Sequence, residues 1–234
     1  AIYGVGGGIT WDSTWESEYR EVHQKAAVLY RKQARFKLIS TGKISQQSLL
    51  FEDQHLERLT KASRYFAYPF DPEELRQKIE EECQACDSHR DYRLRITLSK
   101  SGEMELSRQI LTPLSPTFCQ AKLCLQEADF QQAFTYFKTT HRPHLSLGEQ
   151  EIIYHNAAGE LLETSIGNLV LKIAGKLYTP PTSLGILPGI YRQHLLERGQ
   201  VEEKVLTLAD LNQAEAVYGC NAVRGLYELL FKEK

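Results

Sequence analysis

Residues 163–169 read Glu163-Thr-Ser-Ile-Gly-Asn168-Leu169 and join two short apolar segments. The flanking residues predict successive strands over 161–163 and 168–173. Strand alternation then points Glu163 toward the interior. A buried carboxylate needs a partner, and the protonated ring nitrogen of a bound pyridine would serve. An ordinary strand glutamate is the alternative that this stretch alone leaves open.

Lys138 lies upstream of this stretch, directly after the aromatic run Phe134 to Phe137 and before a turn rich in His and Pro. The run is strand-like, so the lysine can be half-buried at its end. Burial lowers the pKa of an amine and makes its neutral form available for a Schiff base. The alternative is a surface lysine, one of 28 basic residues, and spacing alone favours it.

Two further positions are suited to binding an anion. Gly189-Ile190-Tyr191 opens a predicted helix, and free N–H groups at a helix start bind phosphate. Arg58 lies in a second predicted helix, within Leu56-Glu57-Arg58-Leu59. Each taken alone fits an ordinary helix start or a solvated arginine equally well.

Composition excludes several classes of protein. With 28 basic and 30 acidic residues among 234, the chain has no basic excess of the kind that nucleic-acid binding favours. No apolar run reaches the roughly 20 residues that a membrane span needs.

Five cysteines, an odd number, argue against a disulfide framework and for a reducing, cytoplasmic compartment. Cys83 and Cys86 form a single CxxC pair, and a structural zinc site usually has two; we therefore expect no metal site.

Hydrophobic periodicity predicts a mixed α+β chain in two lobes. Helices are expected at 13–29, with Asp12 or Ser13 as N-cap and Glu16 as capping-box partner, and at 53–68, 72–87, 190–198 and 208–212. Strands are expected on both sides of a turn at Thr41-Gly42-Lys43, and at 92–98, 105–111, 121–126, 134–139, 151–155, 161–163, 168–173, 216–220 and 227–231.

Taken together and in order, these motifs resemble the fold-type IV pyridoxal-phosphate enzymes, which include branched-chain and D-amino-acid aminotransferases and 4-amino-4-deoxychorismate lyases. The resemblance covers residues 34–234 and implies a small α/β lobe followed by a larger pseudo-barrel lobe that binds pyridoxal 5'-phosphate. The matching motifs are His55-Leu-Glu-Arg58-Leu59, Lys138-Thr-Thr-His-Arg142, Glu163-Thr-Ser-Ile-Gly-Asn168-Leu169, Leu187-Pro-Gly-Ile-Tyr-Arg192 and Gly219-Cys220-Asn221-Ala222.

The resemblance implies a role for each motif. Lys138 would bind the cofactor covalently and move protons, and Glu163 would pair with the ring nitrogen. Arg58 would bind the phosphate, and four further residues would join it: the Ile190 and Tyr191 backbone, Cys220 and Asn221. Asn168 is expected to be structural.

Within the family, the lyase branch is the closer match. Its lysine motif often reads Lys-x-x-x-Arg, kept as Lys138 to Arg142, and its last phosphate motif often reads Cys-Asn-Ala. Aminotransferases of the branched-chain type usually have a tyrosine five residues after the lysine, where this chain has Pro143. Ile39-Ser40-Thr41 resembles a Phe-Glu-Thr motif whose threonine lies near the cofactor, so Thr41 is a second catalytic candidate. Arg142, Arg95 and Lys100 are candidates for binding substrate carboxylates.

The first residues resemble the end of chorismate-utilising synthases, in Gly4-Val-Gly-Gly-Gly-Ile9 and Glu18-Tyr19-x-Glu21. In that family Glu21 would match a magnesium ligand, but about 30 residues are too few to enclose a site. We expect residues 1–33 to be the remnant of such a domain plus a linker, 34–115 the small lobe and 116–234 the cofactor-binding lobe.

The combined resemblances predict the C-terminal part of a fused aminodeoxychorismate synthase component I and lyase, a cytoplasmic homodimer that converts 4-amino-4-deoxychorismate to 4-aminobenzoate and pyruvate in folate biosynthesis. No nucleic acid or membrane is expected as a partner. The alternatives are a D-amino-acid or branched-chain-type aminotransferase on the same fold, and a catalytically silent domain of a fused synthase.

Overall fold

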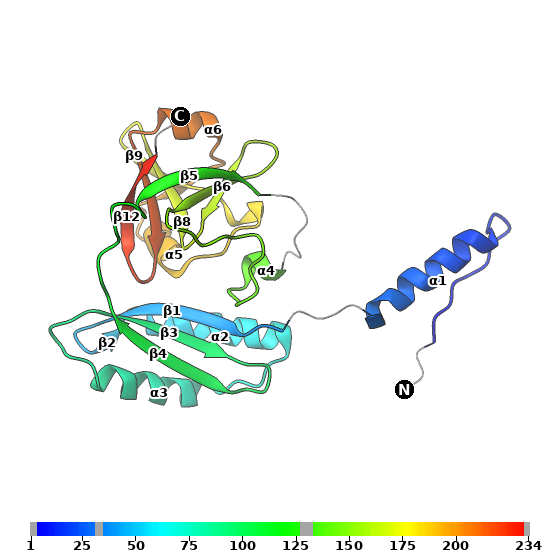
Figure 1. Ribbon diagram of the computed structural model, residues 1–234, viewed down its shortest axis with the longest axis horizontal. Coiled ribbons are helices and arrows are strands. Elements are labelled where there is room, and N and C mark those ends of the chain that lie inside the picture. Colours follow the sequence, from blue (N-terminus) through cyan, green and yellow to red (C-terminus); the bar gives the residue numbers. More distant parts are fainter. Residues whose placement is uncertain (1–3, 31–34, 127–132, 232–234) are drawn as a thin grey trace. The chain divides into compact units, whose positions relative to one another are not determined.

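The computed structural model describes residues 4–30, 35–126 and 133–231, in two units, Ala1–Arg35 and Phe36–Lys234 (Figure 1). The first unit holds helix α1, Trp15–Tyr30. Its N-terminus is capped by Thr14 and Ser17, whose hydroxyls accept from each other's backbone N–H. The predicted cap at Asp12 or Ser13 is therefore wrong, since the Ser13 hydroxyl accepts from the Thr10 N–H and donates to Glu18. Within the described ranges, we find no helix of the length and apolar character that a membrane crossing requires.

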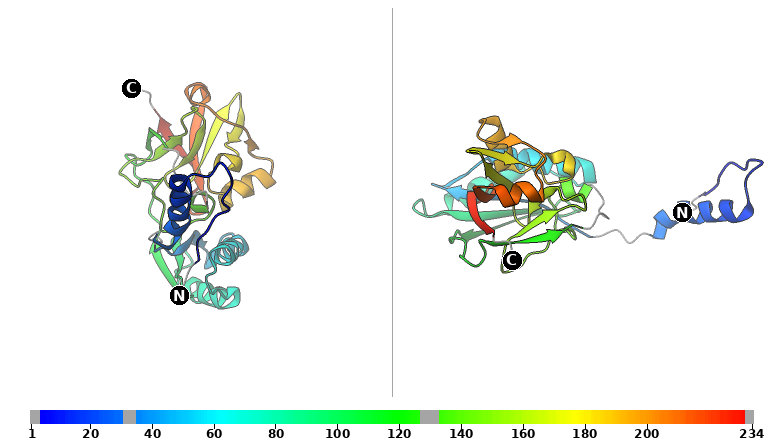
Figure 2. Two further views of the ribbon diagram at one scale, coloured as in Figure 1. Left: turned by 90° about the vertical axis from the view of Figure 1, so that its right-hand side faces the viewer. Right: turned by 90° about the horizontal axis from the view of Figure 1, so that it is seen from above.

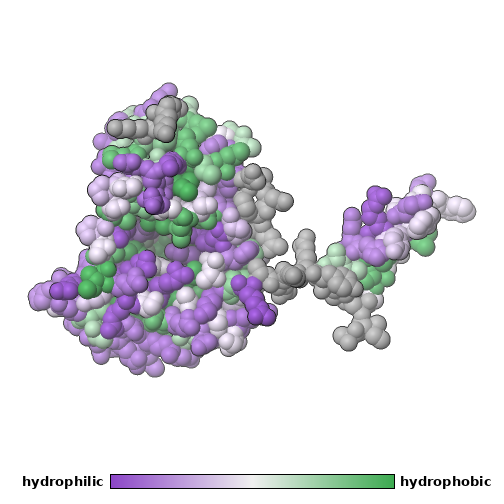
Figure 3. All heavy atoms as spheres, viewed as in Figure 1, coloured by the Kyte–Doolittle hydropathy of each residue, from purple (hydrophilic) through white to green (hydrophobic). Residues whose placement is uncertain are grey.

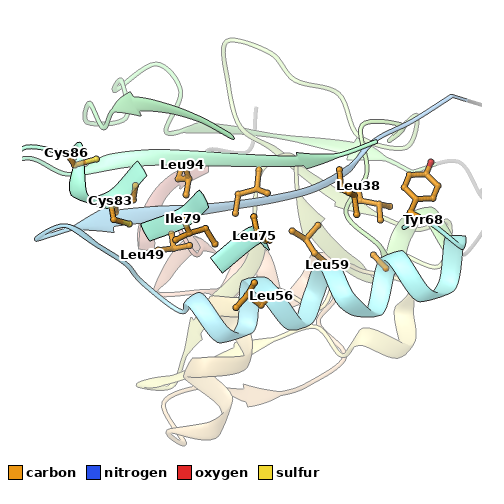
Figure 4. Packing of buried hydrophobic residues seen from close by; sticks show 14 residues of the cluster. Leu38, Leu49, Leu56, Leu59, Tyr68, Leu75, Ile79, Cys83, Cys86 and Leu94 are labelled. Atoms are coloured by element: carbon orange, nitrogen blue, oxygen red, sulfur yellow. The ribbon is translucent and has the colours of Figure 1, made fainter. Parts of the chain in front are cut away.

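The second unit begins with an antiparallel sheet in the order β2-β1-β3-β4, formed by Ser48–Leu49, Leu38–Ser45, Tyr92–Leu98 and Met104–Ile110. Helices α2, Glu52–Phe66, and α3, Pro72–Gln84, cover one of its faces. Leu56 and Leu59 of α2 and Leu75 of α3 pack there against the sheet (Figure 4). On the side drawn in Figure 3, hydrophilic residues cover most of this small lobe.

Strand β1 runs without interruption through Gly42. Residues 38, 40, 42 and 44 face the helices, whereas Thr41 faces the other side and lies opposite Arg95 of β3. The predicted turn at Thr41-Gly42-Lys43 is therefore wrong. The chain turns instead at Gln46 and Gln47, whose positive φ angles of 49° and 56° form the hairpin between β1 and β2.

The rest of the unit is a barrel (Figures 1 and 2). Its sheet runs β10-β9-β8-β11-β12-β5-β6-β7, and a further pairing of β7 with β8, Glu163 opposite Asn168, closes it. Strands β9 and β10, which the periodicity missed, extend the sheet beyond the closed part. The expected α+β architecture with a small lobe and a barrel-like lobe is confirmed. The strands are β5 Gln120–Leu125, β6 Ile152–His155, β7 Leu161–Thr164, β8 Asn168–Ile173, β9 Lys176–Thr179, β10 Glu202–Glu203, β11 Ala216–Asn221 and β12 Gly225–Phe231; the helices are η1 Thr182–Leu184, α5 Ile190–Glu197 and α6 Leu208–Gln213.

The aromatic run before Lys138 is helical rather than extended. Residues Ala133–Tyr136 form the single turn α4, and the ring of Phe134 packs against that of Phe36, with 5.1 Å between the ring centroids. The chain becomes extended only afterwards, where Thr139 forms a bridge with Leu38. Segment 138–140 thus continues the edge of the small sheet.

Candidate active site

Lys138 and Thr41 lie on the same face of the small sheet. The Ile39 N–H donates to the Lys138 carbonyl over 2.9 Å, so these two residues are cross-strand neighbours. Thr139, which is fully buried, points toward the helices with Leu38. Alternation therefore turns Lys138 to the opposite face, with Ile39 and Thr41. Diagonal neighbours in a sheet are about 7–8 Å apart, within reach of a lysine side chain.

The amine of Lys138 is surrounded mainly by cations. Burial is the largest cause that lowers its pKa, and Arg58, Arg142 and Arg95 act in the same direction, whereas Glu163 opposes them. The resulting pKa is about 7. A large fraction of the amine is then neutral near pH 7 and able to act as a nucleophile or base.

Glu163 is the anion of this cluster. It is 2% exposed, and burial raises the pKa of its carboxyl to about 7, although Arg142 acts to lower it. The Arg142 guanidinium lies 3.6 Å from Oε2 of Glu163. Within the described part of the chain, Oε1 is buried and accepts no hydrogen bond. A buried oxygen of this kind is the acceptor that the N–H of a protonated ring would satisfy.

The side chain of Arg58, which belongs to α2, lies beside the start of helix α5. Its guanidinium donates to the carbonyl of Pro188 over 2.8 Å. The N-cap of α5 is Gly189, so no side chain caps the first N–H groups of Ile190 and Tyr191. Burial lowers the pKa of Arg58 to about 10, with a smaller effect from Arg142, so the group is still a cation at neutral pH. A guanidinium beside an open helix N-terminus is an arrangement that binds phosphate.

Asn168 fixes the approach to this helix. Its side-chain amide donates to the Leu187 carbonyl over 2.8 Å. Its Oδ1 occupies the space that a Cβ on Gly189 would need. Only glycine fits at position 189 beside this asparagine, which explains why the chain can bring α5 so close to strand β8.

Cys220 and Asn221 lie near the same place but their side chains are engaged elsewhere. Cys220 is fully buried among apolar residues, and burial raises the pKa of its thiol to about 12. The Asn221 carbonyl oxygen accepts from Val223 and Arg224, and its amide donates to Ile166. These side chains shape the loop, so a phosphate would meet the main chain here.

The candidates for substrate binding separate into two groups. Arg142 and Arg95 both act on the charge of Lys138, and Arg95 lies opposite Thr41. Lys100 is exposed in the turn between β3 and β4. The charges that act on Lys138 come from Arg58, Arg142, Arg95 and Glu163 rather than from Lys100, so the structure favours the two arginines.

His55 belongs to the same motif as Arg58, but the sequence indicates no role for it. His55 is fully buried, and its Nδ1 lies 2.7 Å from the Ser40 hydroxyl. Its place three residues before Arg58, on the same side of α2, is the signal that could have found it. The described residues also hold no cluster of three or more His, Cys, Asp or Glu side chains arranged for a metal ion.

Comparison with known proteins identifies the family. A family model described as amino-transferase class IV matches residues 37–229. The chain belongs to the class IV aminotransferase family. Among curated proteins, the aminodeoxychorismate lyase of Saccharomyces cerevisiae is 30% identical over 128 residues, a match that covers 44% of this chain. The chain spans only about a third of the length of the curated relatives it matches, 35% and 34%.

Solved structures of class IV proteins have the same fold. A candidate amino-acid aminotransferase from Mesorhizobium loti has a TM-score of 0.73 and 27% identity, and the match covers 84% of this chain and 100% of that one. A candidate 4-amino-4-deoxychorismate lyase from Legionella pneumophila has a TM-score of 0.62 and 22% identity, with 83% and 82% covered. The second likeness shows the fold alone.

The cofactor of class IV aminotransferases is pyridoxal 5'-phosphate, as expected from the sequence. The arrangement of charges fits it in three ways. A partly neutral amine, Lys138, matches the aldehyde, and the unpaired Oε1 of Glu163 matches the ring nitrogen. Arg58 and the uncapped start of α5 match the phosphate.

Proposed function

We propose that this class IV protein is a lyase that converts 4-amino-4-deoxychorismate to 4-aminobenzoate and pyruvate. The observation that carries the proposal is the common face of Lys138 and Thr41, a base and a hydroxyl on adjacent strands, with Arg95 opposite the threonine. The Lys138 amine and the Thr41 hydroxyl suffice to remove one proton from the substrate and to return another. The cation of Arg95 matches a substrate that bears carboxylates.

The proposal assigns each residue of the cofactor site a task. Lys138 holds the cofactor, Glu163 accepts the hydrogen bond of its ring nitrogen, and Arg58 with the N–H groups of Ile190 and Tyr191 binds its phosphate. When bound, pyridoxal phosphate withdraws electrons from the substrate carbon that carries the amine. Cys220 and Asn221 are assigned to the loop beside the phosphate.

In this mechanism Lys138 is the base. Its neutral Nζ takes the proton from the carbon that bears the nitrogen, which the lowered pKa permits near pH 7. The C–O bond to the enolpyruvyl group then breaks, and the departing oxygen takes a proton from Lys138 or from the Thr41 hydroxyl. The ring becomes aromatic, which drives the step. All atoms of the substrate end in 4-aminobenzoate and pyruvate, so no second substrate is needed.

The charges of the site favour a substrate with more than one carboxylate. The charges of Arg142 and Arg95 act on Lys138, and among the described residues Glu163 is the anion that opposes them. We assign Arg95 to a substrate carboxylate because it lies across from Thr41 on the face of the sheet that carries Lys138. Arg142 is shared with Glu163.

An aminotransferase is the second candidate, because aminotransferases are among the proteins of similar fold. One experiment separates the two. The purified protein is loaded with pyridoxal phosphate and given 4-amino-4-deoxychorismate without a keto acid. Equal amounts of 4-aminobenzoate and pyruvate support the lyase. Bound cofactor with amino transfer only when a keto acid is added supports the aminotransferase, and absence of cofactor absorbance supports a silent domain.

The partners follow as parts of the same proposal. We propose a homodimer in the cytoplasm, and a fused or associated aminodeoxychorismate synthase that supplies the substrate in folate biosynthesis. Light scattering of the loaded protein tests the dimer. Co-purification with a synthase that forms 4-amino-4-deoxychorismate tests the second partner.

A further inference from the structure

His55 contacts strand β1 on both sides of Thr41. Its Nδ1 lies 2.7 Å from the hydroxyl of Ser40. Its Nε2 faces Gly42, where an added Cβ would lie only 2.5 Å from that nitrogen. The ring, which is fully buried, thus contacts both Ser40, the residue before Thr41, and Gly42, the residue after it.

This contact determines where Thr41 can point. Ser40 and Gly42 face helix α2, and the residue between them faces away. The pairing of β1 with β3 sets this alternation, and the two contacts of His55 add a restraint at Ser40 and Gly42 that holds the Thr41 hydroxyl on the face that carries Lys138 and Arg95. The absence of a side chain at Gly42 makes room for the imidazole, which is the reason for a glycine inside this strand.

A polar pair at this place costs free energy that apolar residues would avoid. The positions of Ser40 and His55 belong to the side of β1 that packs on α2, where Leu38 and Ile44 are core residues. The Ser40 hydroxyl and Nδ1 of His55 satisfy one another, whereas Nε2 of His55 has no hydrogen-bond partner among the described residues. The hydrogen-bonded pair allows one arrangement where apolar side chains would allow several. The Ser40–His55 pair therefore fixes the position of strand β1 on α2 rather than adding to the stability of the fold.

We propose that His55 is a positioning residue, which holds Thr41 toward Lys138 through Ser40 and Gly42. The proposal rests on the lyase function, in which the Thr41 hydroxyl serves the departing oxygen. The ring does this as a neutral group, because burial above all, then Arg58 and Lys138, lowers the pKa of His55 to about 3.

The placement of Thr41 is tested directly by methyl NMR of the protein loaded with pyridoxal phosphate. Ser40→Ala removes the hydrogen bond to His55 but leaves the ring in place, so the variant keeps its core. The Thr41 methyl resonance is expected to move and to show rotamer averaging. Ser63→Ala is the matched control, because Ser63 is also buried but donates within α2 to Thr60. An unchanged Thr41 methyl in Ser40→Ala overturns the proposal.

Kinetics with 4-amino-4-deoxychorismate test the same link. Ser40→Ala is expected to lower kcat roughly tenfold with KM and cofactor absorbance nearly unchanged, since a small misplacement of a reacting group has effects of this size. In a Thr41→Val background, Ser40→Ala should lower kcat no further. Independent, multiplying effects of the two substitutions overturn the positioning role.

The two proposals fail in different ways. If the wild-type protein forms no 4-aminobenzoate, the proposed lyase function is rejected. The methyl spectra still decide whether His55 places Thr41. If the wild type is a lyase but Ser40→Ala has the same kcat as the wild type, the positioning role of His55 is rejected and the lyase function is supported.

Discussion

The guanidinium of Arg142 lies 3.6 Å from the carboxylate of Glu163, and both groups are largely withdrawn from water. Two opposing effects therefore act on Glu163. Burial raises its pKa, Arg142 lowers it, and burial prevails at about 7. With this pKa the Glu163 carboxyl is only partly ionised near pH 7, and a cationic ring nitrogen at the unpaired Oε1 would ionise it fully.

Glu163→Gln should leave the fold intact but impair the reaction. The amide has the size of the carboxyl but no charge to keep a ring nitrogen protonated. We expect pyridoxal phosphate to bind through Lys138 with altered absorbance. We expect kcat to fall by about two orders of magnitude, or ~3 kcal/mol of activation free energy, because the ring nitrogen loses its charged partner. Glu202→Gln, at an exposed ion pair with Lys176, is the control and should keep its rate. A Glu163→Gln variant of normal kcat would exclude this pairing.

Arg142→Met should raise the pKa of Glu163 above the wild-type value. Arg142 is the largest of the causes that lower this pKa, and methionine keeps much of its apolar volume without the charge. Carboxyl carbon NMR of the cofactor-free protein across pH 5–9 measures the shift, with the wild-type transition expected near 7. A transition that stays in place or moves to lower pH would show that the 3.6 Å contact carries no electrostatic weight.

Strands of the second lobe could be predicted from the sequence because they carry continuous apolar runs, as in Leu169 to Leu171, which are fully buried. Their closure into a barrel was expected only from the family resemblance. The turn in β1 was mispredicted for a physical reason. Glycine usually signals a bend, but Gly42 is required by a ring from another element, 13 residues away along the chain. Local sequence does not contain that contact.

The same distinction separates the site residues. Lys138, Glu163 and Arg58 were found because short motifs carry them. Their effects on one another could not be predicted, since the pKa of Lys138 depends on Arg95, which comes from another strand. His55 escaped assignment because a histidine in a helix has no local pattern that reveals a serine across the packing interface.

Lys138→Met should make the stability of the cofactor-free protein less dependent on pH. The folded-state pKa of about 7 lies below the ordinary 10.5, so the unfolded chain binds more protons between these pH values. Burying the amine therefore costs nothing above pH 10.5, more as the pH falls, and its full amount below pH 7. The variant should be the more stable protein at pH 7, by on the order of 3–5 kcal/mol, and the advantage should shrink toward pH 10.

Urea unfolding at pH 7, 8 and 9 measures this difference. Lys122→Met, at an exposed position of β5, reports the effect of the same substitution on the surface. An advantage of Lys138→Met that stays constant over this range would mean that the amine is hydrated in the folded protein. The loaded enzyme should meanwhile lose its cofactor absorbance and activity in this variant.

Gly189→Ala should damage the phosphate site through Asn168. The new Cβ would occupy the place of the Asn168 Oδ1, so either the asparagine leaves its bond to Leu187 or α5 moves away from β8. Overpacking of this kind costs about 1–3 kcal/mol, and a displaced α5 carries the Ile190 and Tyr191 N–H groups out of reach of the phosphate. We therefore expect weaker binding of pyridoxal phosphate as well as a lower melting temperature.

A second substitution separates this collision from a general intolerance of alanine. In Gly189→Ala with Asn168→Ala the colliding oxygen is gone, so cofactor affinity should recover relative to Gly189→Ala alone, although the bond to Leu187 is lost. Gly148→Ala is the matched control, because a Cβ there would meet nothing closer than 3.8 Å. If the double variant binds the cofactor no better than Gly189→Ala, the start of α5 is held by contacts other than Asn168, and the phosphate site depends on them instead.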